Sequence, residues 1–241
     1  EIKELFFVTM TEFEKELPVV VAYLPQVVDN CLAQVIANAG LTQFHVAETE
    51  KYAHITFFLN GTIEEPFPGE DRLVVPSKTG LPYDKQPTMS AYEITDKVLE
   101  NLETYDFIAV NLANGDMVAH TGVLEAGIKA VETLDACLGK IKEKVLALGG
   151  ALVITADHGN CEEMINLETG AVDTGHSTNP VPLWIISTEN RRDAGELEKT
   201  EIPVTGILAD VAPTVLDILN IPQPKEMTGK SLLKTMGRLP L

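Results

Sequence analysis

The chain has 241 residues, of which 45% are hydrophobic and 22% charged, and its formal net charge is −18. The length predicts one large domain or two small ones, and no apolar stretch approaches the ~20 residues that span a bilayer. The acidic excess argues against nucleic acid and anionic membranes as partners, because both bind basic patches. The three cysteines, Cys31, Cys137 and Cys161, are odd in number and form no CxxC pair, which fits a reducing, cytoplasmic compartment.

The first half of the chain predicts strands that alternate with helices. Gly40 follows an apolar periodic run and is typical of a helix C-terminus. Residues 62–89 contain five prolines and little pattern, which is typical of a long functional loop. We expect strands at residues 5–10, 43–47 and 72–75, and helices at residues 27–39 and 48–60.

The second half repeats this alternation. Ser90 and Glu93 predict a capping box at the start of a helix. The longest helix is expected to bury one stripe, made of Leu124, Ile128, Val131, Leu134, Leu138, Ile141, Val145 and Leu148. Further strands are expected at residues 106–112, 151–155 and 183–187, and a last helix at residues 210–219. The alternation predicts an α/β fold with a doubly wound, mainly parallel sheet, with the apolar strand at 151–155 in its centre.

Carboxylates and imidazoles gather where three of these segments end. Asp157 and His158 follow the strand at 151–155, and His176 lies in a rigid loop between Gly175 and two prolines. Asp116 and His120 are four residues apart, so on one helical turn they share a face. Ligands of open α/β sheets bind beyond the carboxyl ends of the strands, so these side chains are expected to meet there.

Mixed Asp and His ligands suit Mn²⁺ or Zn²⁺. Five ligands exceed one tetrahedral site, and the set resembles a pair of ions roughly 3.5–4 Å apart that clamps a phosphoryl group. Taken singly, each histidine is explained by ordinary hydrogen bonding and each aspartate by helix capping; their joint occurrence favours a metal site.

His45 is interpreted as a strand residue and His54 as a helix-surface residue. Lys51 either supplies positive charge for a phosphate or is a solvated surface lysine.

Together, these motifs resemble the cofactor-independent (2,3-bisphosphoglycerate-independent) phosphoglycerate mutases of the alkaline phosphatase superfamily. The resemblance follows the order of the chain and covers nearly all of it. It rests on residues 47–54, 56–58, 87–91, 116–122, 155–160, 176–182, 208–217 and 227–232.

The resemblance implies two Mn²⁺ ions, with Zn²⁺, Mg²⁺ or Co²⁺ as substitutes, and no organic cofactor. Asp116, His120 and His176 match the ligands of one ion, and Asp157 and His158 match ligands of the other. Lys51 matches a lysine that holds the transferred phosphoryl group. In the family a serine takes the phosphoryl group from 3-phosphoglycerate and returns it to the 2-position, through a phosphoserine.

The family's nucleophilic serine, a further aspartate ligand and an arginine-rich substrate domain have no match in this chain. The expectation is therefore a C-terminal metal-binding domain over residues 1–241, with residues 1–26 as the end of a linker from an upstream domain. Alone it is expected to be inactive; the intact enzyme is expected to be a monomer. The alternatives are a phosphopentomutase or metal-dependent phosphatase, and a non-catalytic metal-binding remnant or subunit of a split enzyme.

Overall fold

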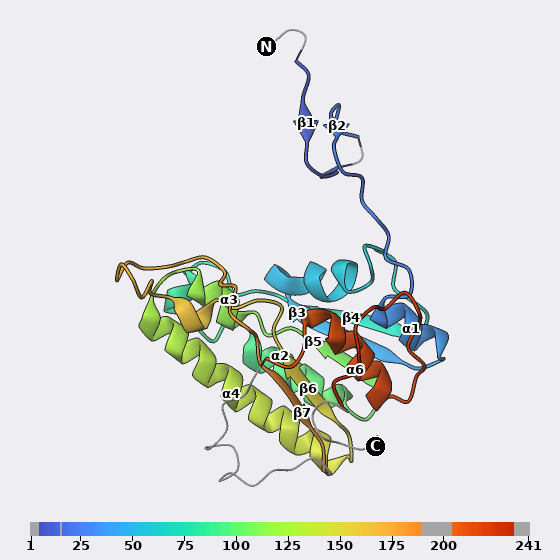
Figure 1. The fold of residues 1–241 in the computed structure, drawn as a ribbon. Coiled ribbons are helices and arrows are strands. Elements are labelled where there is room, and N and C mark those ends of the chain that lie inside the picture. The colour runs from blue at the N-terminus through green and yellow to red at the C-terminus, as the bar shows by residue number, and fades with distance from the viewer. Residues whose placement is uncertain (1–4, 15, 189–203, 234–241) are drawn as a thin grey trace.

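The structure, a computed structural model, describes residues 5–14, 16–188 and 204–233. It has an α/β body crossed by one long helix, and an N-terminal segment that stands away from this body (Figure 1). A three-stranded parallel sheet lies in the body: β3 (Gln43–Glu48) pairs with β4 (Glu70–Val75) on one side and with β5 (Phe107–Val110) on the other. The expected fold class and all three of these strands are confirmed.

Helices cover both faces of this sheet. Phe44 and Val46 of β3 pack with α2 (Ala91–Asn101) and α4 (Leu124–Ala147) in a core that includes Ile94, Val98, Ile141 and Val145. The alternate residues of β3 face the other way, since the Gln43 side chain donates to the carbonyl of Ala33 in α1 (Leu32–Asn38). A second cluster joins α1 to α6 (Val211–Ile218) through Val35, Ile36 and Leu216. All six residues of β3 are therefore buried.

The strand expected at the centre of the sheet lies elsewhere. β6 (Leu152–Thr155) pairs antiparallel with β7 (Leu183–Ile186), and within the described residues it pairs with no other strand. Its residues are half-buried or exposed, so the expectation of a central parallel strand was wrong. A short continuous apolar run is consistent with a fully buried strand, but it does not specify which strand pairs with it.

Three details of the helices also differ from expectation. The helix expected from residue 27 begins only at Leu32, because Asn30 takes the left-handed conformation with φ 57° and interrupts the run. Its end is as expected, with Gly40 at φ 75°. The prediction of a capping box at Ser90 was wrong, because Ser90 Oγ donates to the carbonyl of Pro76 at 2.9 Å. Residues 48–60 fold as a 3₁₀ turn, Thr49–Lys51, and a π-helix, His54–Phe58.

The buried stripe of α4 is only partly the one expected. Ile141 and Val145 are buried, but Leu124, Ile128, Val131 and Leu148 are exposed. The first half of α4 instead turns small residues inward: Ala126, Gly127 and Ala130. This small-residue face lets α4 approach α3 (Asn114–Ala119), which carries Asp116, and leaves room for Met164 against Gly127. Close packing at the site thus decides which face of α4 is buried.

The N-terminal segment contains two short strands, β1 (Val8–Thr9) and β2 (Val20–Val21), which pair in parallel (Figure 1). The expected strand at residues 5–10 is thus reduced to two residues, and β2 lies where no regular structure was expected. Phe6 and Phe13 are each 76% exposed. No helix within the described ranges is long and apolar enough to cross a membrane.

Candidate metal centre

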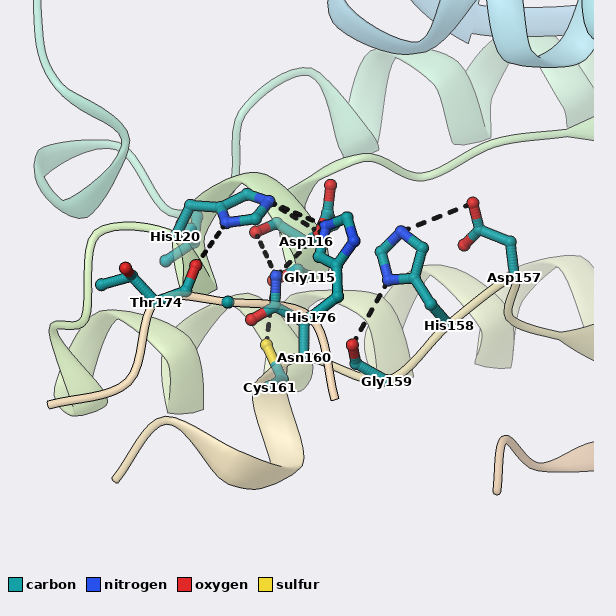
Figure 2. Close-up of polar contacts among 12 residues, drawn as sticks. Gly115, Asp116, His120, Asp157, His158, Gly159, Asn160, Cys161, Thr174 and His176 are labelled. Atoms are coloured by element: carbon teal, nitrogen blue, oxygen red, sulfur yellow. Dashed lines mark hydrogen bonds and ion pairs between the residues drawn. The ribbon is translucent and has the colours of Figure 1, made fainter. Parts of the chain in front are cut away.

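The structure brings together side chains from two segments that are distant in the sequence. Asp116 lies in α3 and His120 just after it, while His176 comes from the loop before β7. Asp116 Oδ1 is 3.1 Å from His120 Nε2 and 3.2 Å from His176 Nε2, and the two imidazole nitrogens are 3.1 Å apart (Figure 2). The three residues form a group able to hold one metal ion.

The hydrogen bond made by His120 Nδ1 fits such an ion. His120 Nδ1 lies 2.7 Å from the carbonyl oxygen of Thr174 (Figure 2). A carbonyl only accepts, so Nδ1 is the donor, and the Nε2 of the neutral ring presents a lone pair to the centre. Lone pairs of a carboxylate oxygen and an imidazole nitrogen then face each other at close range, an arrangement that a cation stabilises. The donor set therefore fits a divalent metal.

Asp116 is held as an anion by two further groups. Its Oδ2 accepts a hydrogen bond from Lys51 Nζ at 2.6 Å, and its Oδ1 accepts one from Asn160 Nδ2 at 2.8 Å. Burial by itself raises the pKa of Asp116, but the hydrogen bonds from Lys51 and Asn160, with the charge of Lys51, outweigh it and hold the pKa at about 2. The carboxylate is therefore ionised and ready to bind a cation.

Asp157 and His158 lie beside this group without joining it. The ring of His158 stacks on that of His176, with centroids 3.6 Å apart and 17° between the planes. His158 Nε2 is 3.6 Å from Asp157 Oδ2 (Figure 2). Within the described residues, these two do not gather a third carboxylate, imidazole or thiol into a second group.

The loops that carry the histidines are tied together by backbone pairing. Ser177 N donates to the carbonyl of Gly159 at 3.0 Å in an isolated antiparallel bridge. This bridge places the residue after His176 against the residue after His158. The sequence predicted that the side chains meet, but the bridge, a contact between distant segments, leaves no local sequence pattern.

The remaining histidines and Cys161 lie outside the group. His45 is a strand residue, as expected, and burial lowers its pKa. His54 is exposed in the π-helix, also as expected. Cys161 Sγ donates to the carbonyl of Gly115 (Figure 2), and burial raises the pKa of this thiol to about 11. Sequence reasoning assigned no role to Asn160, although it lies only two residues after His158.

The fold and this centre define a metalloenzyme: residues 21–223 match the metalloenzyme superfamily, and the chain belongs to it. Among curated proteins, it is 48% identical over 239 residues to the 2,3-bisphosphoglycerate-independent phosphoglycerate mutase of Acaryochloris marina, covering 98% of this chain and 45% of that protein. The mutase of the same name from Moorella thermoacetica is 53% identical over 230 residues, covering 95% and 43%. The chain thus spans a little under half the length of these relatives.

A solved structure of a phosphoglycerate mutase also matches this chain. A crystal structure of Leishmania mexicana phosphoglycerate mutase, studied at low cobalt concentration, superposes with a TM-score of 0.79 at 29% identity. The match covers 92% of this chain and 43% of that protein. The expected resemblance to phosphoglycerate mutases and the expected use of a divalent metal are therefore supported by sequence and by fold.

Proposed function

We propose that this chain forms the metal-binding part of a 2,3-bisphosphoglycerate-independent phosphoglycerate mutase. Such an enzyme converts 3-phosphoglycerate to 2-phosphoglycerate through a phosphoserine, in glycolysis and gluconeogenesis. The observation that carries the proposal is the convergence of Asp116, His120 and His176, with Lys51 bonded to the same aspartate, in a chain about half identical to such mutases.

The proposed cofactor is a pair of Mn²⁺ ions. Asp116, His120 and His176 would hold the first ion, and Asp157 and His158 would contribute to the second. When bound, the ions would neutralise phosphoryl oxygens and lower the pKa of a hydroxyl nucleophile. Because Asp157 and His158 lack a third ligand among the described residues, we expect this chain to bind the second ion weakly.

The chain's own residues supply charge and orientation. Lys51 carries a largely buried ammonium group at the edge of the centre, where a phosphoryl oxygen would compete with Asp116 for its protons. The Thr174 carbonyl holds the ring of His120 in the tautomer that a metal ligand needs. Both groups are held by contacts within the chain, so we expect substrate binding to require little ordering of them.

The proposed nucleophile is a serine supplied by another part of the intact enzyme. The hydroxyls of four of the five serines in this chain are engaged elsewhere: Ser77 donates to Glu48, Ser90 to Pro76, Ser177 to Glu162 and Ser231 to Asp217. Ser187 Oγ is buried. Without a nucleophile and substrate-binding arginines, the isolated chain is expected to be inactive, since covalent catalysis and positioning are both lost.

The proposed organisation is one metal-binding domain over residues 1–241, with residues 1–26 connecting it to the remainder of a monomeric enzyme. The separation of β1 and β2 from the body supports a connecting role (Figure 1); residues 1–4 and 15 lie outside the described part. A cytoplasmic location is proposed because all three cysteines are free.

A chimaera tests the activity. The upstream part of the Moorella thermoacetica mutase is fused to this chain, and 3-phosphoglycerate turnover is followed through enolase with and without added Mn²⁺. We expect turnover that requires Mn²⁺, that Asp116→Asn abolishes, and that the chain alone does not show. An inactive chimaera that nevertheless folds would contradict the proposal.

The alternatives give different results with the chain alone. Metal-dependent hydrolysis of a phosphate monoester would indicate a phosphatase, and turnover of a pentose phosphate would indicate a phosphopentomutase. A folded chain that binds metal but stays inactive in every fusion would indicate a non-catalytic remnant. A natural partner chain that restores activity would indicate a split enzyme.

A further inference from the structure

Asn160 is a buried amide whose donor group is directed at a proposed metal ligand. Only 5% of the residue is exposed. Its Nδ2 lies 2.8 Å from Asp116 Oδ1 and 3.4 Å from the Asp116 carbonyl oxygen (Figure 2). Both neighbours are acceptors, so the amide has one orientation, with the NH₂ group on Asp116. Asn160 Oδ1 is buried and has no hydrogen-bond partner within the described residues.

The contact fixes the rotation of the Asp116 carboxylate. Lys51 holds Oδ2 and Asn160 holds Oδ1, so each oxygen has one donor from outside the imidazole pair. Without Asn160, the carboxylate could rotate about its Cβ–Cγ bond, because of these two donors only Lys51 would remain. With it, Oδ1 stays directed at the two histidine nitrogens.

Asn160 is itself anchored. Its backbone N–H donates to Glu162 Oε2 at 2.8 Å, and Glu162 in turn accepts from Asn179 at 3.1 Å. Asn160 also belongs to the loop that begins with Asp157 and His158. One side chain therefore ties that loop to α3, across 44 residues of sequence.

We propose that Asn160 is a positioning residue that sets the metal affinity of the centre by orienting Asp116. This inference rests on the proposed metal centre, and it assigns Asn160 no contact with substrate. Outer hydrogen bonds to metal ligands typically change metal affinity by about 10- to 100-fold.

Asn114 provides a matched control. It lies on the same helix as Asp116, it is fully buried, and its Oδ1 also lacks a partner in the described part of the chain. Its Nδ2, however, donates to the carbonyls of Ala130 and Pro87. Asn114→Leu thus removes a comparable buried amide that makes no hydrogen bond to a proposed ligand.

The test is a Co²⁺ titration of the metal-free 241-residue chain, followed by calorimetry and by the visible absorption of bound Co²⁺. For Asn160→Leu we expect a dissociation constant raised about 10- to 100-fold and altered absorption bands. For Asn114→Leu we expect a lower unfolding temperature, with the dissociation constant and spectrum of the unchanged chain.

The inference would be overturned by unchanged affinity and spectrum in Asn160→Leu, or by equal weakening in Asn160→Leu and Asn114→Leu. Asn160→Ser, whose side chain is too short to reach Asp116, replaces Asn160→Leu if the latter fails to fold. Failure of both to fold would assign Asn160 a structural role and also overturn it. Absence of Co²⁺ binding by the unchanged chain would instead reject the metal centre itself.

Discussion

Replacing Lys51 by methionine should lower the stability of the metal-free protein and strengthen metal binding. Lys51 Nζ is 2.6 Å from Asp116 Oδ2, and the two side chains are only 11% and 15% exposed. Breaking a buried pair costs about 3–5 kcal/mol, whereas exposed pairs contribute about 0–1 kcal/mol. Because this pair is largely buried and Asn160 still donates to Asp116, we expect a loss of about 2 kcal/mol at neutral pH.

The effect on metal binding has the opposite sign. The Lys51 ammonium repels a cation at the Asp116 carboxylate and occupies one of its oxygens. Two unit charges about 4 Å apart interact by about 1 kcal/mol even in water, and the repulsion is larger for a divalent ion at a site with less solvent. We therefore expect the Mn²⁺ dissociation constant to fall about fivefold or more, because 1.4 kcal/mol corresponds to about tenfold.

Urea unfolding in the presence of a chelator and calorimetric Mn²⁺ titration measure the two effects separately. Lys129→Met is the control: its ammonium is 3.0 Å from Glu132 on an exposed face of α4, and neither quantity should change. Unchanged metal-free stability in Lys51→Met, or weaker Mn²⁺ binding, would refute this account of the pair.

Two further predictions concern ionisable groups that are wholly or partly buried. Glu48 is buried at the end of β3, and burial raises the pKa of its carboxyl group above the usual value. A carboxyl group with a raised pKa stabilises the folded state at pH values below its pKa in the unfolded chain. It loses that contribution as the pH rises through its pKa in the folded chain. Glu48→Gln should therefore gain unfolding free energy relative to the unchanged chain as pH rises from 4 to 7; a difference independent of pH would contradict this. Burial, and then the charges of Glu162 and Asp116, raise the pKa of Cys161 to about 11. The folded chain should therefore be alkylated at Cys161 by iodoacetamide at pH 8 roughly a hundredfold more slowly than the chain unfolded in urea. Peptide mass spectrometry measures both rates, and equal rates would show that the thiol is accessible and ordinary.

The sequence predicted that Asp116, His120 and His176 lie close together, and the structure groups these three; Asp157 and His158, expected at the same place, lie beside the group. Asp116 and His120 needed only helical spacing, and His176 needed only a stiff loop. For Lys51, the residue pattern left two interpretations open, because a lysine after a strand has no local sign of burial, and only the family resemblance assigned it a role. Its partner is Asp116, 65 residues away.

Pairing and burial were harder to predict because they depend on contacts between distant segments. The apolar run 151–155 is as hydrophobic as a central strand, yet β6 pairs antiparallel with β7, outside the parallel sheet. Along α4, hydrophobicity favoured the large side chains, whereas the approach of α3 requires Ala126, Gly127 and Ala130. Ser90 has the spacing of a cap, but the carbonyl of Pro76, from another segment, accepts its hydroxyl.

Each residue of the candidate triad is held by a residue outside the triad. The Thr174 carbonyl orients His120, the ring of His158 stacks on His176, and Lys51 and Asn160 hold Asp116. These contacts lie within the folded chain, so the residues that build the fold also orient the ligand side chains. The core between β3, α2 and α4 is made of residues outside the triad. We therefore expect substitutions at Lys51 or Asn160 to change metal affinity without unfolding the core.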